Sequence, residues 1–407
     1  MFEFVAPLLK KTYNFEGVDE EEMQNYQFEV LKYSPKIGID LIKTMKQEEI
    51  QQNDEIKRQK EEIKFLQAKV HQLEQDITTL KCFKGNCELN LSSFENEIKV
   101  FEAEDFEQPN YSNRIGCGAF GEVYKLKCEK DNNYYGVKII HNEFNEELKT
   151  KLQSEITILS KLSYPSLIKL HGITLAYPYF IITDFIPNHS VQYFINKAST
   201  DEPQDGWNMT NKFIIIFGIA LGMRYMHSMN IIHRDLKPDN VLLESNFYPK
   251  ICDFGVSQIY SSAQRINVST GAGTTEFCGP EVYNASSDNE YDGKKADIFS
   301  FGITLYSIIY DSIPFAEVTN KHRIPLEIIN GHRPELKNKD FQSINELINQ
   351  CWQQKPYKRP DFEEIIHILF GIKAIYAESG IIDETMVNNY IKFCDSGEIR
   401  DFDQISK

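Results

Sequence analysis

The sequence lacks the patterns that define several large classes of protein. Its eight cysteines among 407 residues form no C-x-x-C pair, so neither a zinc site of that kind nor a thioredoxin-like motif is indicated. The longest apolar runs, near residues 213–223 and 298–310, fall short of the roughly 20 residues that span a bilayer. The N-terminus has no basic segment followed by a long apolar stretch, so we expect no signal peptide. These absences favour a cytoplasmic protein without a membrane partner.

Positive charge is also scarce, since 44 Lys and Arg residues stand against 60 Asp and Glu residues, which gives a net charge of −16. A protein that coats nucleic acid or an anionic membrane needs a basic surface, so we expect neither as a partner. The composition is otherwise that of a globular protein, with 41% hydrophobic residues. At about 100–200 residues per domain, the length indicates two or three domains.

Residues 1–107 differ from the rest in charge and periodicity. They contain 14 basic and 23 acidic residues and so carry −9 of the total charge. Apolar residues recur there every seven positions, with leucines three positions later: Ile56, Ile63, Val70 and Ile77, then Leu66, Leu73 and Leu80. This pattern predicts a helical region with a coiled coil over about residues 42–82, and its β-branched and leucine positions favour a parallel homodimer. A single amphipathic helix lying on the neighbouring domain is the alternative.

The remaining chain divides into a mixed domain and a tail. Phe106–Asn113 reads as a linker with one proline. Short alternating strands followed by longer helical stretches predict an α/β domain over residues 108–371. Residues 372–407 form a polar, acidic tail, with a short helix expected around Glu384–Lys392.

Three glycines with the spacing G-x-G-x-x-G, Gly116, Gly118 and Gly121, form the first motif that carries chemistry. The spacing alone is weak, because dinucleotide-binding and phosphate-covering loops both use it. A dinucleotide-binding loop opens a helix, whereas the residues after Gly121 alternate and turn at residues 131–133 like a β-hairpin. Glycines between two strands let the backbone close over a polyphosphate. A purely structural hairpin turn is the alternative.

Lys138 lies in an apolar, strand-like run, Tyr135–Ile140. A buried ammonium is costly unless it is paired, and either a phosphate or a carboxylate would serve. Glu155, in the helical stretch that follows, is the natural carboxylate.

The densest polar cluster is His233–Leu242, which runs into an apolar strand. Asp235 can accept a proton from an incoming hydroxyl, and Lys237 can neutralise developing charge. Asn240 and Asp253, which lies 13 residues further on, offer the hard oxygen ligands that Mg²⁺ prefers. The order and spacing favour a catalytic site over a solvated cluster of surface charges.

In this order the motifs resemble those of the eukaryotic protein kinases, over residues ~110–371. The resemblance implies an α+β, two-lobed protein kinase fold, with a small β-rich lobe and a large helical lobe after the N-terminal helical segment. It also implies ATP and Mg²⁺ as cofactors and the hydroxyl groups of protein substrates as phosphoryl acceptors.

The resemblance assigns a role to each catalytic position. The glycine motif would cover the ATP phosphates, which Lys138 would contact while paired with Glu155. Asp235 would be the catalytic base, and Asn240 and Asp253 would bind Mg²⁺.

The same resemblance places the nucleotide base. Thr183 would be the gatekeeper residue, and Asp184, Phe185 and Ile186 would form the hinge that hydrogen-bonds adenine. The apolar residues expected to complete this site are Ile115, Val123 and Leu242.

Two features indicate a Ser/Thr kinase. Lys237-Pro238 after the catalytic aspartate is typical of Ser/Thr kinases, and Thr274 fits the same class. The stretch Cys351–Ile365 resembles the tyrosine-kinase-like group of Ser/Thr kinases, in which Arg359 would pair with Glu281.

The sequence departs from the family pattern at a few positions. Gly136 stands where alanine is usual, which should loosen the packing over the adenine, and Phe299 stands where tryptophan is usual. No catalytic group is lost, so we expect an active kinase in signal transduction. The alternatives are a dimeric scaffold that binds ATP with little turnover, and a metal-free nucleotide-binding module. Arg234 is expected to contact a phosphate group on the activation segment, the stretch between Asp253 and Glu281. The candidate phosphate acceptors there are Ser261, Ser262, Ser269, Thr270 and Thr275.

Overall fold

The computed structural model describes most of the chain between residues 98 and 396. The described ranges are 98–118, 121–140, 146–175, 177–200, 202, 204–259, 273–285, 291–338 and 341–396. All of them lie in the second of the two units into which the chain divides, Cys87–Lys407. The coiled coil predicted over about residues 42–82 lies outside the described residues.

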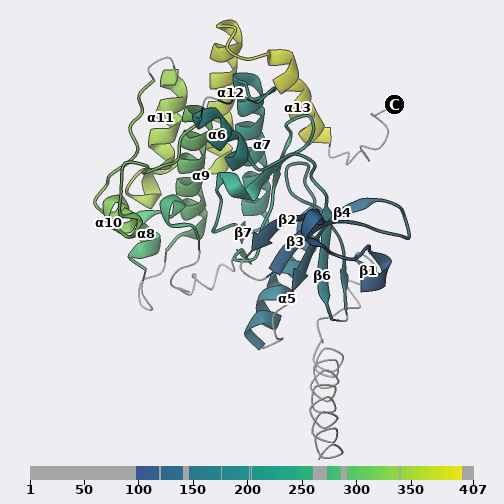
Figure 1. The fold of residues 1–407 in the computed structure, drawn as a ribbon. Coiled ribbons are helices and arrows are strands. Elements are labelled where there is room, and N and C mark those ends of the chain that lie inside the picture. The colour runs from purple at the N-terminus through teal and green to yellow at the C-terminus, as the bar shows by residue number, and fades with distance from the viewer. Residues whose placement is uncertain are drawn as a thin grey trace, which may run out of the picture. The chain divides into compact units, whose positions relative to one another are not determined.

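Six strands form a sheet in the order β1-β5-β6-β4-β3-β2. Their bounds are β1 (Lys99–Phe101), β2 (Arg114–Gly118), β3 (Gly121–Lys127), β4 (Tyr134–Ile140), β5 (Leu170–Thr174) and β6 (Tyr179–Asp184). β1 runs parallel to β5, and the other neighbouring strands are antiparallel. Helix α5 (Glu146–Lys161) lies beside the sheet (Figure 1). This sheet and α5 form the small lobe.

Strand β1 precedes the expected start of the catalytic domain at residue 108. Phe101 and Phe106 are 1% and 3% exposed, and their ring centroids lie 5.3 Å apart in the apolar core of the sheet. Phe106 also forms a β-bridge with Cys128. Residues 98–106 therefore pack with the sheet, as β1 and a 3₁₀ turn (Ala103–Asp105), and the predicted linker begins inside the core.

Helices form the large lobe, and α7, α9 and α12 run side by side in it (Figure 1). Its helices are α6 (Val191–Ser199), α7 (Met209–Ser228), α8 (Pro280–Tyr283), α9 (Gly293–Tyr310), α10 (Ile324–Ile329), α11 (Gln342–Cys351), α12 (Phe362–Glu378) and α13 (Glu384–Ser396). α7 and α9 are buried along almost their whole length, as expected of helices that are apolar on all sides. Asn208 and Asp292 cap their N-termini by accepting hydrogen bonds from backbone N–H groups.

The chain passes between the lobes at residues 185–190, from β6 to α6, and short strands and 3₁₀ turns after α7 carry the polar cluster. They are β7 (Ile231–Ile232), the 3₁₀ turn η3 (Pro238–Asn240), β8 (Val241–Leu243), β9 (Pro249–Ile251), β10 (Gln258–Ile259) and the 3₁₀ turn η4 (Thr275–Phe277). β7 pairs with β10, and β8 pairs with β9. The α+β, two-lobed fold is confirmed for the described residues.

Most of the described part of the predicted tail is helical, and the short helix expected around Glu384–Lys392 is confirmed as α13. α12 continues past the expected domain end at residue 371, and α13 buries Val387, Tyr390 and Cys394. Tyr390 meets the ring of Tyr248, which precedes β9, with centroids 4.6 Å apart. α13 thus packs on the large lobe.

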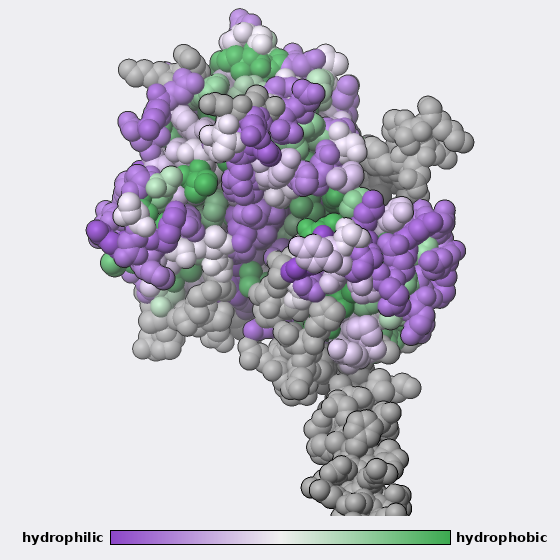
Figure 2. All heavy atoms as spheres, in the orientation of Figure 1, coloured by the Kyte–Doolittle hydropathy of each residue, from purple (hydrophilic) through white to green (hydrophobic). Residues whose placement is uncertain are grey.

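The surface shows no large apolar area on the face drawn in Figure 2, which is mostly hydrophilic with small, separate apolar patches. Within the described ranges, no helix combines the length and apolar character that crossing a membrane requires.

Candidate active site

The loop that carries Asp235 is built on a buried carboxylate from α9. Asp297, 1% exposed, accepts hydrogen bonds of 2.8 Å from the backbone N–H groups of His233 and Arg234. His227 lies 2.9 Å from the same carboxylate. Arg234 has φ 70°, a left-handed conformation that a non-glycine residue adopts only when its surroundings impose it. Sequence reasoning missed Asp297 as a site residue, although a single acid inside an apolar helix was the available signal.

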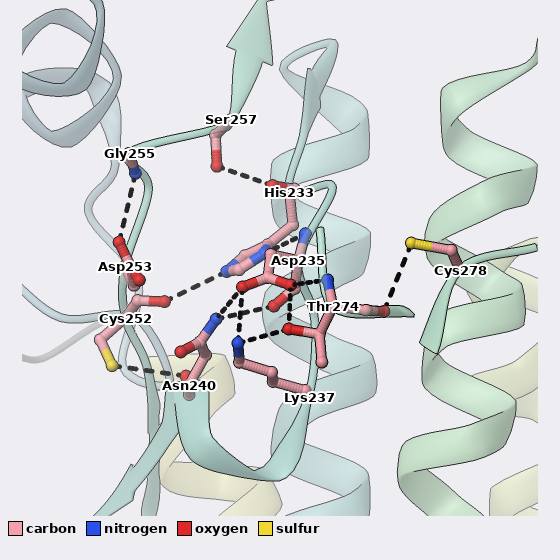
Figure 3. A network of polar contacts seen from close by, with 10 residues as sticks. All are labelled: His233, Asp235, Lys237, Asn240, Cys252, Asp253, Gly255, Ser257, Thr274 and Cys278. Atoms are coloured by element: carbon pink, nitrogen blue, oxygen red, sulfur yellow. Dashed lines mark hydrogen bonds and ion pairs between the residues drawn. The ribbon is translucent and has the colours of Figure 1, made fainter. Parts of the chain in front are cut away.

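Both oxygens of the Asp235 carboxylate are engaged (Figure 3). Oδ1 accepts hydrogen bonds from the backbone N–H of Thr274 at 2.7 Å and from its hydroxyl at 2.9 Å. Oδ2 accepts one from the Asn240 amide at 3.0 Å and lies 2.9 Å from the Lys237 ammonium. Lys237 also donates to the Thr274 hydroxyl at 2.5 Å. Four donors from two loops therefore orient one carboxylate.

His233 links this loop to the segment that precedes Asp253. Its Nδ1 lies 3.3 Å from the Asp235 backbone nitrogen, and its Nε2 lies 3.2 Å from the carbonyl oxygen of Cys252. Its ring packs on Phe254, with centroids 5.4 Å apart. The backbone N–H of Cys252 donates to the carbonyl oxygen of Asn240 at 2.9 Å. These hydrogen bonds hold the segments that carry Asp235, Asn240 and Asp253 next to one another.

The donor set fits a magnesium ion. The amide nitrogen of Asn240 faces Asp235, donating to its carbonyl oxygen at 2.7 Å and to its carboxylate, so the amide oxygen is the atom left for a cation. Asp253, at φ 63°, adds a carboxylate. One carboxylate and one amide oxygen suit Mg²⁺, which keeps waters and takes substrate phosphates as further ligands. Among the described residues, no cluster of three or more His, Cys, Asp or Glu side chains offers a closed metal site.

Lys138 and Glu155 form the ion pair expected from the sequence. The ammonium lies 2.7 and 2.9 Å from the two carboxylate oxygens, and their side chains are only 14% and 8% exposed. Burial lowers the pKa of Lys138, but the charges of Glu155 and Asp253 outweigh it and hold that pKa above its usual value. Lys138 is therefore charged, and it lies near enough to Asp253 for that carboxylate to raise its pKa.

The glycine motif is a tight hairpin between β2 and β3, in which Gly118 pairs with Gly121 and Gly116 pairs with Val123. A Cβ atom at Gly121 would lie 2.3 Å from the carbonyl oxygen of Ile139, so only glycine lets the hairpin approach β4. The motif does not open a helix, which rules out a dinucleotide-binding loop.

The predicted hinge begins at the last residue of β6, Asp184. A Cβ atom at Gly136 would lie 2.9 Å from the carbonyl oxygen of Asp184 and 3.2 Å from the hydroxyl of Thr183. Thr183 donates a hydrogen bond of 3.2 Å to the Gly136 carbonyl oxygen. β4 and β6 therefore approach closely at Gly136, and looser packing over the adenine stays a prediction. Ile186, the third hinge residue, is 7% exposed.

Apolar residues expected around the base lie on both lobes. Ile115 on β2 is 52% exposed, Val123 lies on β3, and Leu242 lies on β8, where it bridges to Ser190. Contact with a planar nucleotide base would remove their exposed apolar surface from water, which would stabilise the bound base.

The end of the activation segment is fixed to the large lobe. Arg359 makes a bidentate contact with Glu281, at 2.5 Å from Nη1 to Oε1 and 2.8 Å from Nη2 to Oε2. Its guanidinium and that of Arg333 lie 5.1 and 4.8 Å from the ring of Phe299, which therefore still serves as a cation–π partner. The candidate phosphate acceptors lie outside the described residues, except Thr275 in η4.

This geometry agrees with comparison to known proteins. A family model of protein tyrosine and serine/threonine kinases matches residues 110–369, more than half of the chain. The chain therefore belongs to the protein kinase family.

Its relatives include named Ser/Thr kinases. The chain is 28% identical over 268 residues to serine/threonine-protein kinase STY17 of Arabidopsis thaliana, and 28% identical over 276 residues to serine/threonine-protein kinase CTR1 of the same plant. It is 29% identical over 269 residues to dual specificity protein kinase shkC of Dictyostelium discoideum. The matches cover 65%, 66% and 65% of this chain but only 45%, 32% and 51% of those relatives. The likeness is consistent with the tyrosine-kinase-like group.

Proposed function

We propose that the chain is an ATP-dependent protein kinase that phosphorylates serine and threonine hydroxyls. The observation that carries the proposal is the Asp235 carboxylate held by Lys237, Asn240 and Thr274. A carboxylate fixed in this way, beside a lysine and two hard oxygen ligands, suits the activation of a hydroxyl group next to a polyphosphate.

The mechanism uses this chain's own groups in fixed roles. Asp235 accepts the proton of the attacking hydroxyl, and Lys237 offsets the charge that develops near it. Asn240 and Asp253 would hold Mg²⁺, and Lys138, kept charged and oriented by Glu155, would bind phosphate oxygens. Mg-ATP, when bound, supplies the phosphoryl group that is transferred.

Thr274 supports an aliphatic hydroxyl as the acceptor. Its side chain joins Asp235 to Lys237, with distances of 2.9 and 2.5 Å, and this threonine stands at the position that the sequence pattern associates with Ser/Thr kinases. The name of shkC nevertheless makes a tyrosine acceptor worth testing in the same assay.

A phosphate-transfer assay with Mg-ATP tests the proposal. Wild type should label a Ser/Thr protein substrate, and Asp235→Asn should lower kcat by roughly 10²- to 10⁴-fold, the usual worth of a general base. Asp205→Asn is the matched control, because Asp205 is an exposed acid in the loop before α7. Wild-type protein that binds ATP without transferring phosphate would instead support the scaffold alternative.

We further propose that the chain acts in the cytoplasm in signal transduction, as a homodimer formed through residues 42–82. The heptads of that segment support dimerisation, which would raise the effective concentration of one catalytic domain toward the other. A monomer in sedimentation equilibrium of the full chain would reject the dimer.

A further inference from the structure

The carboxylate of Asp184, the last residue of β6, is held from β5. Its Oδ1 atom lies 2.6 Å from Nε2 of His171, and its Oδ2 atom accepts a hydrogen bond of 3.2 Å from the backbone N–H of Lys169. The backbone N–H of Asp184 donates to the carbonyl oxygen of Lys169 at 3.1 Å. Three contacts therefore fix the first residue of the hinge.

A β-bulge places the histidine in this position. In the register of β5 and β6, Leu170 lies opposite Thr183 and Gly172 lies opposite Ile182, so His171 is the extra residue. Bulges redirect a side chain and are frequent beside active sites. The interruption of the regular pairing turns His171 toward Asp184.

Packing restricts the His171 ring further. The ring meets that of Tyr135 edge-on, with centroids 5.2 Å apart, and Tyr135 lies opposite Asp184 in the register of β4 and β6. The Tyr135 hydroxyl donates to Asp131 at 2.8 Å, which fixes the tyrosine in turn. Because its ring is already confined, His171 loses little conformational entropy when it bonds Asp184.

The charges around Asp184 keep it ionised. Burial raises its pKa, but the hydrogen bond from His171 and the positive charge of Lys250 outweigh burial and hold the pKa below its ordinary value. Lys250 lies 3.5 Å from Glu244, so its charge is shared between two carboxylates. His171 is thus the side chain that contacts the Asp184 anion directly.

The residues on either side of Asp184 are tied to other strands. Thr183 donates to the Gly136 carbonyl oxygen on β4. The ring of Phe185 lies 4.6 Å from the ammonium of Lys125 on β3, which also lies 4.4 Å from the ring of Tyr134. Three consecutive side chains therefore connect the hinge to β4, β5 and β3. The contact to β5 is charge-assisted on the carboxylate side and so is the strongest of the three.

We propose that His171 is a positioning residue for nucleotide recognition, because it holds the Asp184 carboxylate and thereby fixes the backbone of Asp184–Ile186 where an adenine base would bind. This inference rests on the proposed function, since it assigns His171 to the adenine site of an ATP-dependent enzyme. It predicts that the histidine affects the choice and affinity of the nucleotide, and that it leaves the chemical step unchanged.

Steady-state kinetics on the full chain test this role, with ATP and GTP as phosphoryl donors. His171→Ala should raise KM for ATP roughly three- to tenfold, as expected for one partly exposed hydrogen bond to a charged group, with kcat changed by less than about twofold. The preference for ATP over GTP should fall by a similar factor, because a fixed hinge backbone distinguishes the two base edges. His171→Gln, whose amide can still donate to Asp184, should recover most of the affinity.

A matched control is available in the large lobe. His332 also lies beside carboxylates, at the longer distances of 3.4 Å from Glu327 and 3.5 Å from Glu317. His332→Ala should leave the KM for ATP and the ATP/GTP preference unchanged, which separates the position of His171 from the general loss of a histidine–carboxylate pair.

Each outcome decides between the two proposals. An unchanged KM in folded His171→Ala, or a KM raised equally for ATP and GTP, overturns the positioning role and leaves the kinase function standing. Wild type that transfers no phosphate refutes the proposed function instead, and titration with a fluorescent ATP analogue then still tests His171. Should His171→Ala fail to fold, Asp184→Ala and His171→Gln decide, because Asp184→Ala removes the acceptor for His171 and must raise KM for ATP as the loss of the histidine would.

Discussion

Removal of the Thr274 hydroxyl is the sharpest test of how Asp235 is held. Thr274→Val keeps the shape of the side chain and the backbone N–H, which donates to Asp235 at 2.7 Å. It removes two hydrogen bonds of the hydroxyl group, the one that it donates to Asp235 at 2.9 Å and the one that it accepts from Lys237 at 2.5 Å. A hydrogen bond to a charged group contributes about 1.5–3 kcal/mol, and about 1.4 kcal/mol corresponds to a tenfold change. We therefore expect kcat/KM to fall roughly 10- to 100-fold.

The assay compares Thr274→Val, Thr274→Ser and wild type on one serine-containing protein substrate. The fall should appear in kcat, because the carboxylate matters at the proton transfer and not in ATP binding. Serine restores the hydroxyl and should recover most of the rate. Thr304→Val is the control, since Thr304 is fully buried in α9 and its hydroxyl has no hydrogen-bond partner within the described part of the chain.

Equal activity of Thr274→Val and wild type would refute the reasoning, because the backbone N–H would then suffice to orient Asp235. A loss shared equally by the valine and serine variants would point instead to general packing at this position.

Three further predictions concern stability. Gly172→Ala should lower the free energy of unfolding by roughly 1–3 kcal/mol in urea titrations, because the added Cβ atom would lie 2.2 Å from the carbonyl oxygen of Lys99 on β1. An unchanged urea concentration at the midpoint of unfolding would mean that β1 does not pack on β5. Tyr390→Ala should cost roughly 3–5 kcal/mol in the same assay, because its ring is 1% exposed, whereas no loss would show that α13 adds nothing to the lobe. Burial raises the pKa of Asp184, but the hydrogen bond with His171 helps to hold that pKa below its ordinary value. The ionised carboxylate therefore stabilises the folded chain fully above the unfolded pKa of about 3.9, and this stabilisation is lost as the pH falls through the lower folded pKa. The stability gap between wild type and Asp184→Asn should therefore be full at pH 7 and shrink in strong acid, and a gap independent of pH would contradict this.

The candidate catalytic residues could be picked out from the sequence because they lie in short, contiguous runs. His233–Leu242 contains the proposed base, a lysine and a proposed metal ligand within a few positions, and the structure keeps them together in one loop. The pairing of Lys138 with Glu155 spans 17 residues, yet it was accessible because a lysine in an apolar strand demands a partner.

The residues that position these groups could not be predicted from the sequence in the same way. Asp297 lies in a helix that is apolar on all sides, and periodicity does not tell which loop such a lone acid will meet. The bulge at His171 is a matter of register between two strands, which a single sequence does not specify. The close approach of the Asp184 backbone to Gly136 likewise depends on the pairing of β4 with β6, which the glycine alone does not reveal.

The segments on either side of the matched kinase region attach to elements that carry candidate site residues. β1 pairs with β5, the strand whose bulge presents His171 to the predicted hinge. α13 packs on α7 and on Tyr248, just before β9, the strand that leads to Asp253. Each segment buries apolar side chains against the framework that orients the candidate site residues. Since such a framework must hold its groups to within about 0.5 Å for efficient catalysis, we expect both segments to contribute to activity, although they lie outside the residues that the family model matches.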